Sequence, residues 1–122
     1  MSYTRNNPNP CCILTPDCVV RAVAHATGKS WDRIYTELSV QGFEMCTPFV
    51  VNSVWGAYLD EQGFPSYDIA RACSVREFAE QHPNGVYILG TGTHAVAVIS
   101  GRYLDAWDSG DEQVLYYYIL ED

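Results

Sequence analysis

The apolar positions in the first two thirds of the chain recur at the spacing of helices. The first predicted helix begins at Thr15-Pro16-Asp17-Cys18, where capping residues and a proline meet, and continues through the mostly apolar positions 19–26. Gly28 is suited to end it, because glycine readily adopts the left-handed conformation that follows many helices. Since nearly every side of this segment is apolar, we expect a helix that is buried on most sides.

Three more helices are predicted from amphipathic stripes with start and stop signals. One follows Ser30 and runs to about Val40, and the next starts at Thr47-Pro48 and stops at Gly63. The last is short and opens with the capping box Ser74-Val75-Arg76-Glu77.

After about residue 85 the pattern changes from helical spacing to the alternation typical of strands. Four strands are predicted there, at residues 86–89, 93–99, 102–107 and 113–120, with Ser100-Gly101 as a two-residue turn between the middle two. Helices followed by an antiparallel meander predict an α+β fold. The length of 122 residues predicts a single domain, residues 1–122.

Two segments add to this pattern. Asn7-Pro8-Asn9-Pro10 cannot be helical, because each proline restricts itself and its predecessor, so residues 1–15 are predicted to be extended. Three consecutive tyrosines, residues 116–118, must alternate between the two faces of their strand. This favours an edge or surface strand, and the sharper alternative is a homodimer interface.

The charge and the N-terminus limit the partners and the location. Seven basic against fifteen acidic residues give a net charge of −8, which disfavours nucleic acid and anionic membranes as partners. No apolar run approaches the roughly 20 residues of a membrane span. The first ten residues are polar and lack the apolar region of a secretory signal, so a cytoplasmic location is expected.

The five cysteines are odd in number and include no Cys-x-x-Cys pair. In a reducing compartment a disulfide framework is not expected, and the histidines do not lie at zinc-finger spacing from the cysteines. The sequence therefore implies no metal and no organic cofactor.

Three residues carry candidate chemistry. Cys18 lies in the first turn of the buried helix, where the partial positive charge of the helix N-terminus stabilises a thiolate. His94 opens a predicted strand after the flexible Gly90-Thr91-Gly92, and Asp105 lies in the return strand. Taken singly, Cys18 and His94 are each more readily explained as ordinary core residues. Together, in this order, they match a nucleophile, a base and a group that orients the base.

The predicted hairpin selects the acid. If Ser100-Gly101 is the turn, Val96 faces Asp105 and His94 faces Trp107, so these four side chains share one face and Trp107 can shield the Asp105–His94 pair. Asp108 then lies on the other face, in an ordinary polar turn. An odd residue in the turn would reverse this choice.

Two charged neighbours of Cys18 complete the predicted helix start. Asp17 is expected to turn toward the helix backbone as a cap, which leaves His94 as the dominant neighbour of the thiol. Arg21, one helical turn after Cys18, is expected to form an ion pair with a nearby acid, with stabilisation of the thiolate or binding of a substrate carboxylate as alternatives.

The segments DCVVRAVAHATGKSWDRIY and THAVAVISGRYLDAWDS resemble small papain-like cysteine peptidases of bacteria and their phages. The resemblance spans nearly the whole chain, from Asn7-Pro8-Asn9-Pro10 to the last strand. It implies a minimal papain-like fold, in which the nucleophile helix packs on a C-terminal antiparallel sheet, and the catalytic residues Cys18, His94 and Asp105. Bacteriocin-leader peptidases and cell-wall amidases share this order, so the resemblance does not specify the substrate.

The resemblance predicts a peptidase or amidase that hydrolyses a peptide or amide bond through a thioester. Papain has a glutamine for its oxyanion hole six residues before the nucleophile, where this chain has Cys12. Either Asn7 or Asn9 takes that role, or the hole consists of backbone N–H groups such as that of Cys18. The alternatives are a non-catalytic peptide-binding or phage accessory protein with the same fold, and a redox sensor that pairs Cys18 with Cys11 or Cys12.

Overall fold

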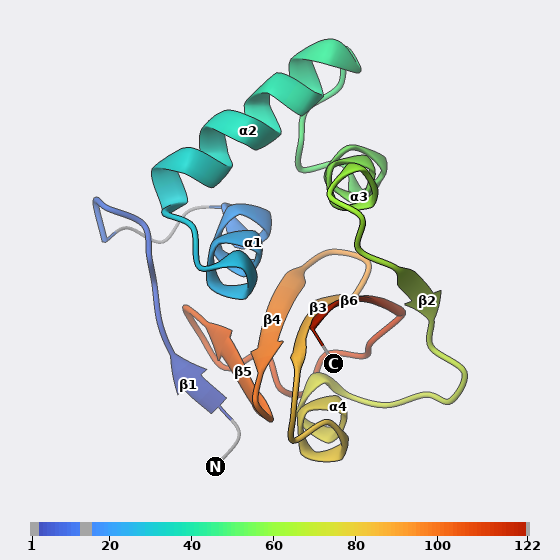
Figure 1. The fold of residues 1–122 in the computed structure, drawn as a ribbon. Coiled ribbons are helices and arrows are strands. Elements are labelled where there is room, and N and C mark those ends of the chain that lie inside the picture. The colour runs from blue at the N-terminus through green and yellow to red at the C-terminus, as the bar shows by residue number, and fades with distance from the viewer. Residues whose placement is uncertain (1–2, 13–15, 122) are drawn as a thin grey trace.

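The structure, a computed structural model, describes residues 3–12 and 16–121. Within these residues the chain forms four helices and a six-stranded mixed sheet in an α+β arrangement (Figure 1). The helices are α1 (Cys18–Thr27), α2 (Trp31–Glu44), α3 (Asn52–Glu61) and α4 (Val75–Gln81), and the strands are β1 (Tyr3–Arg5), β2 (Ser66–Asp68), β3 (Val86–Gly90), β4 (Ala95–Ile99), β5 (Arg102–Asp105) and β6 (Tyr116–Glu121). None of these helices is long and apolar enough to cross a membrane.

The strands lie in the order β1-β5-β4-β3-β6-β2. The four central strands come from the part of the chain where they are predicted, and all neighbours among them are antiparallel. The two edge strands were not predicted: β1 pairs with β5 in parallel, and β2 pairs with β6 in antiparallel fashion. Each has only three residues, too few for an alternating pattern to stand out from the sequence.

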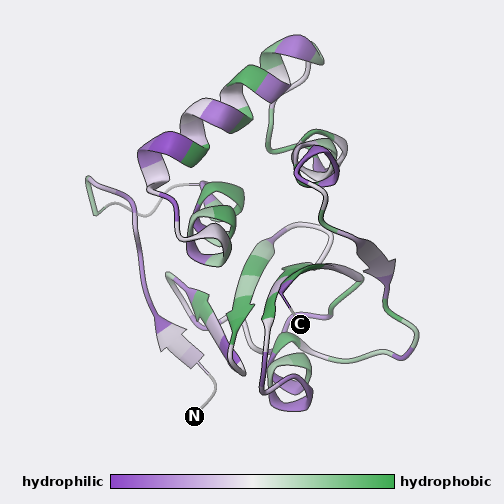
Figure 2. Ribbon diagram, in the orientation of Figure 1, coloured by the Kyte–Doolittle hydropathy of each residue, from purple (hydrophilic) through white to green (hydrophobic). Residues whose placement is uncertain are grey.

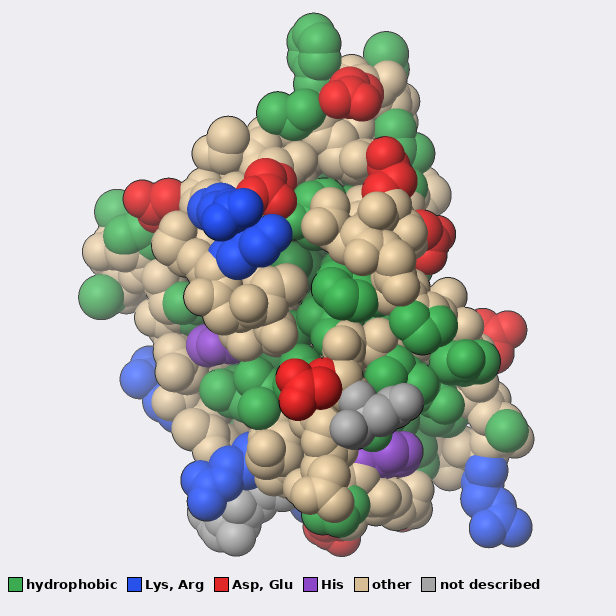
Figure 3. All heavy atoms as spheres, viewed as in Figure 1, with side chains coloured by type: hydrophobic (Ala, Val, Ile, Leu, Met, Phe, Trp, Pro, Cys, Tyr) green, Lys and Arg blue, Asp and Glu red, His purple; other side chains and the backbone are tan. Residues whose placement is uncertain are grey.

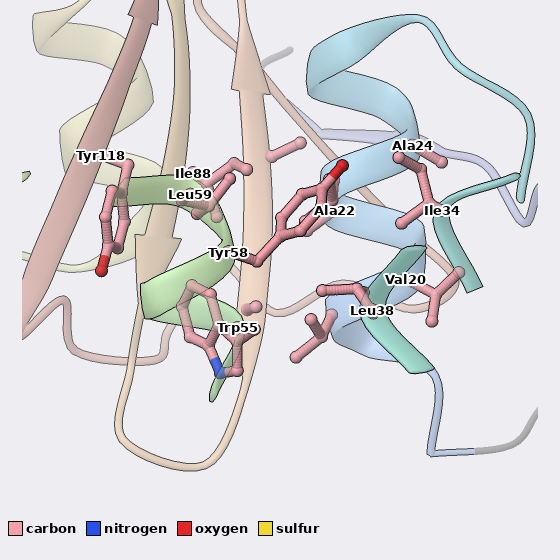
Figure 4. Close-up of a cluster of buried hydrophobic side chains, with 14 residues drawn as sticks. Val20, Ala22, Ala24, Ile34, Leu38, Trp55, Tyr58, Leu59, Ile88 and Tyr118 are labelled. Carbon is pink, nitrogen blue, oxygen red and sulfur yellow. The ribbon is translucent and has the colours of Figure 1, made fainter. Parts of the chain in front are cut away.

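The sheet has a buried core on each face. Helices α1, α2 and α3 cover one face, where Val20, Ile34 and Leu38 meet Trp55 and Leu59 (Figure 4). The second cluster gathers on the other face around α4. Figure 2 shows α1, β3 and β4 as largely hydrophobic, whereas α2 alternates between hydrophobic and hydrophilic residues. The nearly continuous apolar character of α1 thus matches its burial between α2 and the sheet.

Of the three tyrosines of β6, Tyr118 is buried and the other two are half-buried. Tyr116 and Tyr118 pack against Trp55 of α3, with ring centroids 6.0 and 5.9 Å apart, and Tyr117 points to the opposite face against Phe78 of α4. The predicted alternation is therefore confirmed, but the predicted edge position is wrong because β2 pairs along the outer side of β6. The feature that suggested a homodimer interface is thus accounted for by packing within one chain.

Most helix ends follow local sequence signals. Gly28 ends α1 with φ of 73°, and Ser30 accepts a hydrogen bond from the N–H of Arg33. Ser74 and Glu77 form both hydrogen bonds of the predicted capping box. Two bounds differ from the prediction: α2 continues to Glu44, and α3 begins at Asn52, because residues 47–51 form turns in place of a first helical turn.

The β4–β5 hairpin forms as predicted. Ser100 and Gly101 have φ of 51° and 77°, the conformation of a two-residue turn that matches the twist of the strands. Ile99 pairs with Arg102, and Val98 pairs with Tyr103. This register brings Asp105, at the end of β5, back toward the start of β4.

The close approach of β6 to Gly90 allows a test of this packing. A methyl group at Gly90 would collide with the ring of Tyr116, so Gly90→Ala should lower the free energy of unfolding by about 1–3 kcal/mol, as measured by chemical denaturation. In a Tyr116→Ala background the same substitution should cost much less. An equal cost in both backgrounds would contradict the proposed contact.

Candidate active site

Cys18 is the first residue of α1, and its side chain is half-buried. The backbone N–H groups of a first helical turn have no partner within the helix, and they carry the positive end of the helix dipole. The thiol also accepts a hydrogen bond from the backbone N–H of Ala95 and bonds to the ring of His94. A sulfur atom in this position is surrounded by donors that favour its anionic form.

His94 joins Cys18 to Asp105. Its Nε2 lies 2.5 Å from Oδ2 of Asp105, so Nδ1 is the ring nitrogen left to interact with the thiol of Cys18. The side chain of His94 is 6% exposed, and the ring of Trp107 stacks on it with centroids 5.0 Å apart. Trp107 therefore shields the Asp105–His94 pair, as the hairpin register predicts.

Asp105 is buried and receives several hydrogen bonds. Besides His94, the hydroxyl of Ser109 donates to Oδ2 at 2.7 Å, and the backbone N–H of Ala106 donates to Oδ1 at 2.8 Å. The alternative acid, Asp108, lies elsewhere: it accepts from the hydroxyl of Tyr103 at 2.6 Å. Sequence reasoning assigned Ser109 to an ordinary polar turn and missed it, since only the folded turn brings it back to Asp105.

The prediction that Val96 shares one face of the sheet with His94 and Asp105 is only partly right. Val96 belongs to the core cluster on the α4 side, whereas Cys18 packs against the cluster on the α1 side. His94 reaches Cys18 because it lies just before β4, where strand alternation no longer applies. The hairpin register therefore identifies the acid that bonds to His94, but Val96 does not share the environment of His94.

Burial and hydrogen bonding act in opposite directions on the pair Cys18–His94. Burial disfavours the thiolate, but the bonds from His94 and Ala95, together with the charges of His94 and Arg21, hold the pKa of Cys18 below its ordinary value. Burial also disfavours a charged imidazole, yet the bonds to Asp105 and Cys18 raise the pKa of His94 to about 9. Both shifts act in the direction of a thiolate beside an imidazolium.

The carboxylate of Asp105 is held in its ionised form. Burial alone would raise its pKa, but hydrogen bonds from His94 and Ser109, the charge of His94 and the N–H of Ala106 lower the pKa of Asp105 below the ordinary range. Asp105 can thus stabilise positive charge on the ring of His94 over the whole neutral range.

Asp17 does not act as the predicted cap, because its side chain makes no capping hydrogen bond. Its carboxylate pairs with Arg21 and also accepts from Nε1 of Trp31 at 2.9 Å and from Nδ2 of Asn9 at 3.2 Å. The ion pair predicted for Arg21 is confirmed, and Arg21 bonds to Asp105 as well, with Nη2 3.2 Å from Oδ1. An ionic partner one helical turn away outcompetes the local capping bond.

The two asparagines predicted for the oxyanion hole are engaged elsewhere. Oδ1 of Asn7 accepts from the N–H of Asn9, and the amide nitrogen of Asn9, the donor that an oxyanion would need, donates to Asp17 at 3.2 Å. Neither occurs among the described residues that line the cavity beside Cys18 and His94. This geometry does not support the oxyanion role predicted for Asn7 or Asn9.

That cavity, of about 250 Å³, lies between the start of α1, the start of α3 and the loop before β4. Sequence reasoning missed Asn52, which lines the cavity together with Cys18 and His94. Nε1 of Trp55 donates to Oδ1 of Asn52 at 3.1 Å, which holds the side chain of Asn52 in place at the cavity. No sequence signal singles out Asn52, because its proximity to Cys18 arises from the packing of α3.

A larger apolar groove of about 990 Å³ adjoins this cavity, and Pro16 and Val50 line both. Its walls come from α2 and the α2–α3 connection, where Phe43 is 84% exposed. Figure 3 shows hydrophobic side chains projecting at the top of the molecule, where α2 ends in Figure 1. The aromatic and apolar lining residues include Trp31, Tyr35, Phe43, Pro48 and Phe49.

The remaining candidate groups lie apart from this arrangement. His82 stacks on Phe78 of α4, and its Nδ1 is 2.8 Å from the carbonyl oxygen of Phe78. All five cysteines have free thiols, and Cys11 and Cys46 line the apolar groove. Among residues 3–12 and 16–121, no three His, Cys, Asp or Glu side chains gather as metal ligands.

The electrostatics of Cys18 predict its reactivity. With a lowered pKa, Cys18 should be alkylated rapidly by iodoacetamide at pH 6, where an ordinary thiol with a pKa of about 8.5 is only about 0.3% ionised. His94→Ala should slow labelling at pH 6 by about tenfold or more and have little effect at pH 9. Mass spectrometry gives the rate at each cysteine, and Cys73, whose pKa burial raises, is the internal control. A wild-type midpoint near 8.5 would show an unactivated thiol.

Comparisons with protein-family models, with curated proteins and with solved structures found no match for this chain. The functional assignment therefore rests on the geometry around Cys18.

Proposed function

We propose that this protein is a cysteine peptidase or amidase with a minimal papain-like fold. The observation that carries the proposal is the position of Cys18 at the start of a buried helix, bonded to His94, whose other nitrogen is bonded to Asp105. A nucleophile, a base and a group that orients the base are the parts that acyl transfer requires. The packing of α1 on the antiparallel pair β4–β5, which begins just after His94 and ends at Asp105, supports the papain-like arrangement.

In the first half of the reaction, the thiolate of Cys18 attacks the carbonyl carbon of the substrate and forms a tetrahedral oxyanion. As the carbon–nitrogen bond breaks, Nδ1 of His94 gives its proton to the leaving amine, which departs neutral. Cys18 is then joined to the acyl group by a thioester, and His94 is neutral. Asp105 keeps the ring of His94 oriented throughout, through its bond to Nε2.

In the second half, the neutral ring of His94 takes a proton from a water molecule that attacks the thioester. A second tetrahedral oxyanion forms and collapses, the carbon–sulfur bond breaks, and a carboxylic acid is released. Cys18 leaves as a thiolate beside the imidazolium of His94, so the starting state is restored. The shielding by Trp107 keeps solvent from competing for the Asp105–His94 bond.

The oxyanion is stabilised by the first-turn N–H of Cys18 and by the side chain of Asn52. The N–H belongs to the positive end of α1, and Asn52 lines the same cavity with its Oδ1 already engaged by Trp55. Donors that are held in place before the reaction stabilise the developing charge without reorganisation.

The substrate is a peptide or amide with a large apolar side chain on the acyl part. The groove beside the cavity is long, aromatic and continuous with the cavity at Pro16 and Val50. Among its described lining residues the only charged group is Asp17, which is already paired with Arg21. A charged side chain would therefore lose its hydration without finding a partner.

The same groove would serve the alternative function, a peptide-binding protein without catalysis. A binding protein needs the groove but not an activated thiol. Reactivity and turnover at Cys18 therefore separate the two functions.

Hydrolysis of a fluorogenic peptide library tests the catalytic assignment. Cys18→Ser should lower the rate at least about a thousandfold and leave the circular dichroism spectrum unchanged, because the two side chains are of similar size. His94→Ala should have a comparable effect. The matched control is Cys12→Ser, which changes an exposed thiol outside the cavity and should keep full activity. Peptide binding by the wild type without turnover, and with an unactivated Cys18, would favour the binding protein.

The groove predicts a substrate preference that the same library measures. Peptides with Phe or Leu at one acyl-side position should be cleaved faster than those with Asp or Lys there. Tyr35→Ala should lower kcat/KM for the preferred peptides about tenfold, because burial of an aromatic side chain contributes about 1.5–3 kcal/mol. Tyr67→Ala is the control, since Tyr67 is also exposed but lies on β2, and it should leave the preference unchanged. Equal losses in both variants would contradict the role of the groove.

A further inference from the structure

Two buried charges take no part in the proposed reaction. Asp17 is 5% exposed and Arg21 is 2% exposed, and both belong to the start of α1, next to Cys18. A buried charge is costly unless it is paired and hydrogen-bonded, so an ion pair at this depth calls for an explanation beyond stability.

The contacts of these residues form one continuous network of ion pairs and hydrogen bonds that ends at Cys18. Asp17 pairs with Arg21, Nη2 of Arg21 lies 3.2 Å from Oδ1 of Asp105, and Oδ2 of Asp105 lies 2.5 Å from Nε2 of His94. Trp107 covers this network on its outer side, and the guanidinium carbon of Arg21 lies 5.1 Å from the centroid of the Trp107 ring. The imidazole stacks on the same ring.

Along this network the charges alternate in sign. Asp17 is negative, Arg21 positive, Asp105 negative, the imidazolium of His94 positive and the thiolate negative. Without Asp17, more of the charge of Arg21 would act on Asp105 and would offset the negative charge that the imidazolium needs. With Asp17 in place, the guanidinium is already neutralised from its other side. Asp105 then keeps its charge for His94.

The shape of the guanidinium adds an orienting effect. It is planar and presents its N–H groups in a rigid fork, so one group can hold two carboxylates in a fixed relation. Asp17 is itself anchored by Trp31 and Asn9. The orientation of Asp105 is thereby tied to the start of α1, where the nucleophile lies.

We propose that Asp17 and Arg21 are positioning residues of this site: Arg21 orients the carboxylate of Asp105, and Asp17 offsets the charge of Arg21 so that Asp105 can stabilise a charged His94. This inference rests on the proposed function. It assigns a role to two residues that sequence reasoning treated as a helix cap and an ordinary ion pair.

Other titratable groups near Asp105 do not provide this effect. Tyr3 of β1 donates its hydroxyl to the backbone oxygen of Asp105, at 3.3 Å, and not to the carboxylate. Asp108 is engaged by Tyr103 and by the N–H of Gly110. Burial, and then the charge of Arg21, lower the pKa of His25 on α1, so it is neutral around pH 7.

The test follows the imidazole of His94 by NMR titration, with the resonance assigned through His94→Ala. Asp17→Asn keeps the size of the side chain but removes the carboxylate charge that Asp17 places beside Arg21. The pKa of His94 should therefore fall by about one unit, a tenfold smaller imidazolium population above that midpoint. The matched control is Asp32→Asn, which removes the same charge from an exposed position in the first turn of α2 and should leave this pKa unchanged.

The double variant Asp17→Asn/Arg21→Met separates charge compensation from a merely structural role. Removal of both charges should return the pKa of His94 toward the wild-type value, although two contacts have been lost. A structural role predicts that the double variant is at least as perturbed as the single one. Arg21→Lys keeps the charge but not the fork, so it should lower kcat about tenfold with KM unchanged, because Asp105 is less well oriented.

A measurement on the wild type applies even if the variants do not fold. The Nε–H resonance of Arg21 should titrate with the midpoint of His94, because the two groups share Asp105. An independent midpoint, or an unchanged pKa of His94 in folded Asp17→Asn, would overturn the positioning role. If Cys18 is unreactive and no peptide is cleaved while the midpoints still coincide, the proposed function fails and the coupling of these charges remains.

Discussion

The site depends on one buried carboxylate, that of Asp105. It accepts hydrogen bonds from the turn that follows it, through Ser109 and Ala106, and it bonds to His94 and Arg21. A buried carboxylate is stable only with such a set of donors. These donors come from the turn after β5, from the loop before β4 and from α1. Asp105 therefore joins the three parts of the chain that make up the site.

The fold fixes the positions of Cys18 and Asp105 relative to each other. The apolar sides of α1 are buried between α2 and the sheet, so the position of Cys18 is set by packing and not by a flexible loop. The tight Ser100-Gly101 turn sets the register that returns Asp105 to His94. Two rigid elements thus hold Cys18 and Asp105 in place, as the proposed acyl transfer by a thiolate requires.

The apolar groove and the network of buried charges lie on different sides of α1. Toward α2 the lining is aromatic and nearly uncharged, which suits the recognition of a substrate side chain. Toward β5 the groups are charged and buried, which suits control of proton position. Cys18 lies where the two sides meet, so in the proposed function one helix N-terminus serves both recognition and chemistry.

The sequence by itself determined the elements and the candidate triad, because these depend on local signals. Capping residues, the buried helix around Cys18 and the two-residue turn before Arg102 all act within a few positions of one another. That turn was enough to identify Asp105 and not Asp108 as the partner of His94. What only the tertiary structure decided are contacts between distant segments: the edge strands β1 and β2, the bonds from Asn9 and Trp31 to Asp17, and the approach of Asn52 to the cavity. No local pattern encodes these contacts, since they arise from how α1, α2 and α3 pack on the sheet.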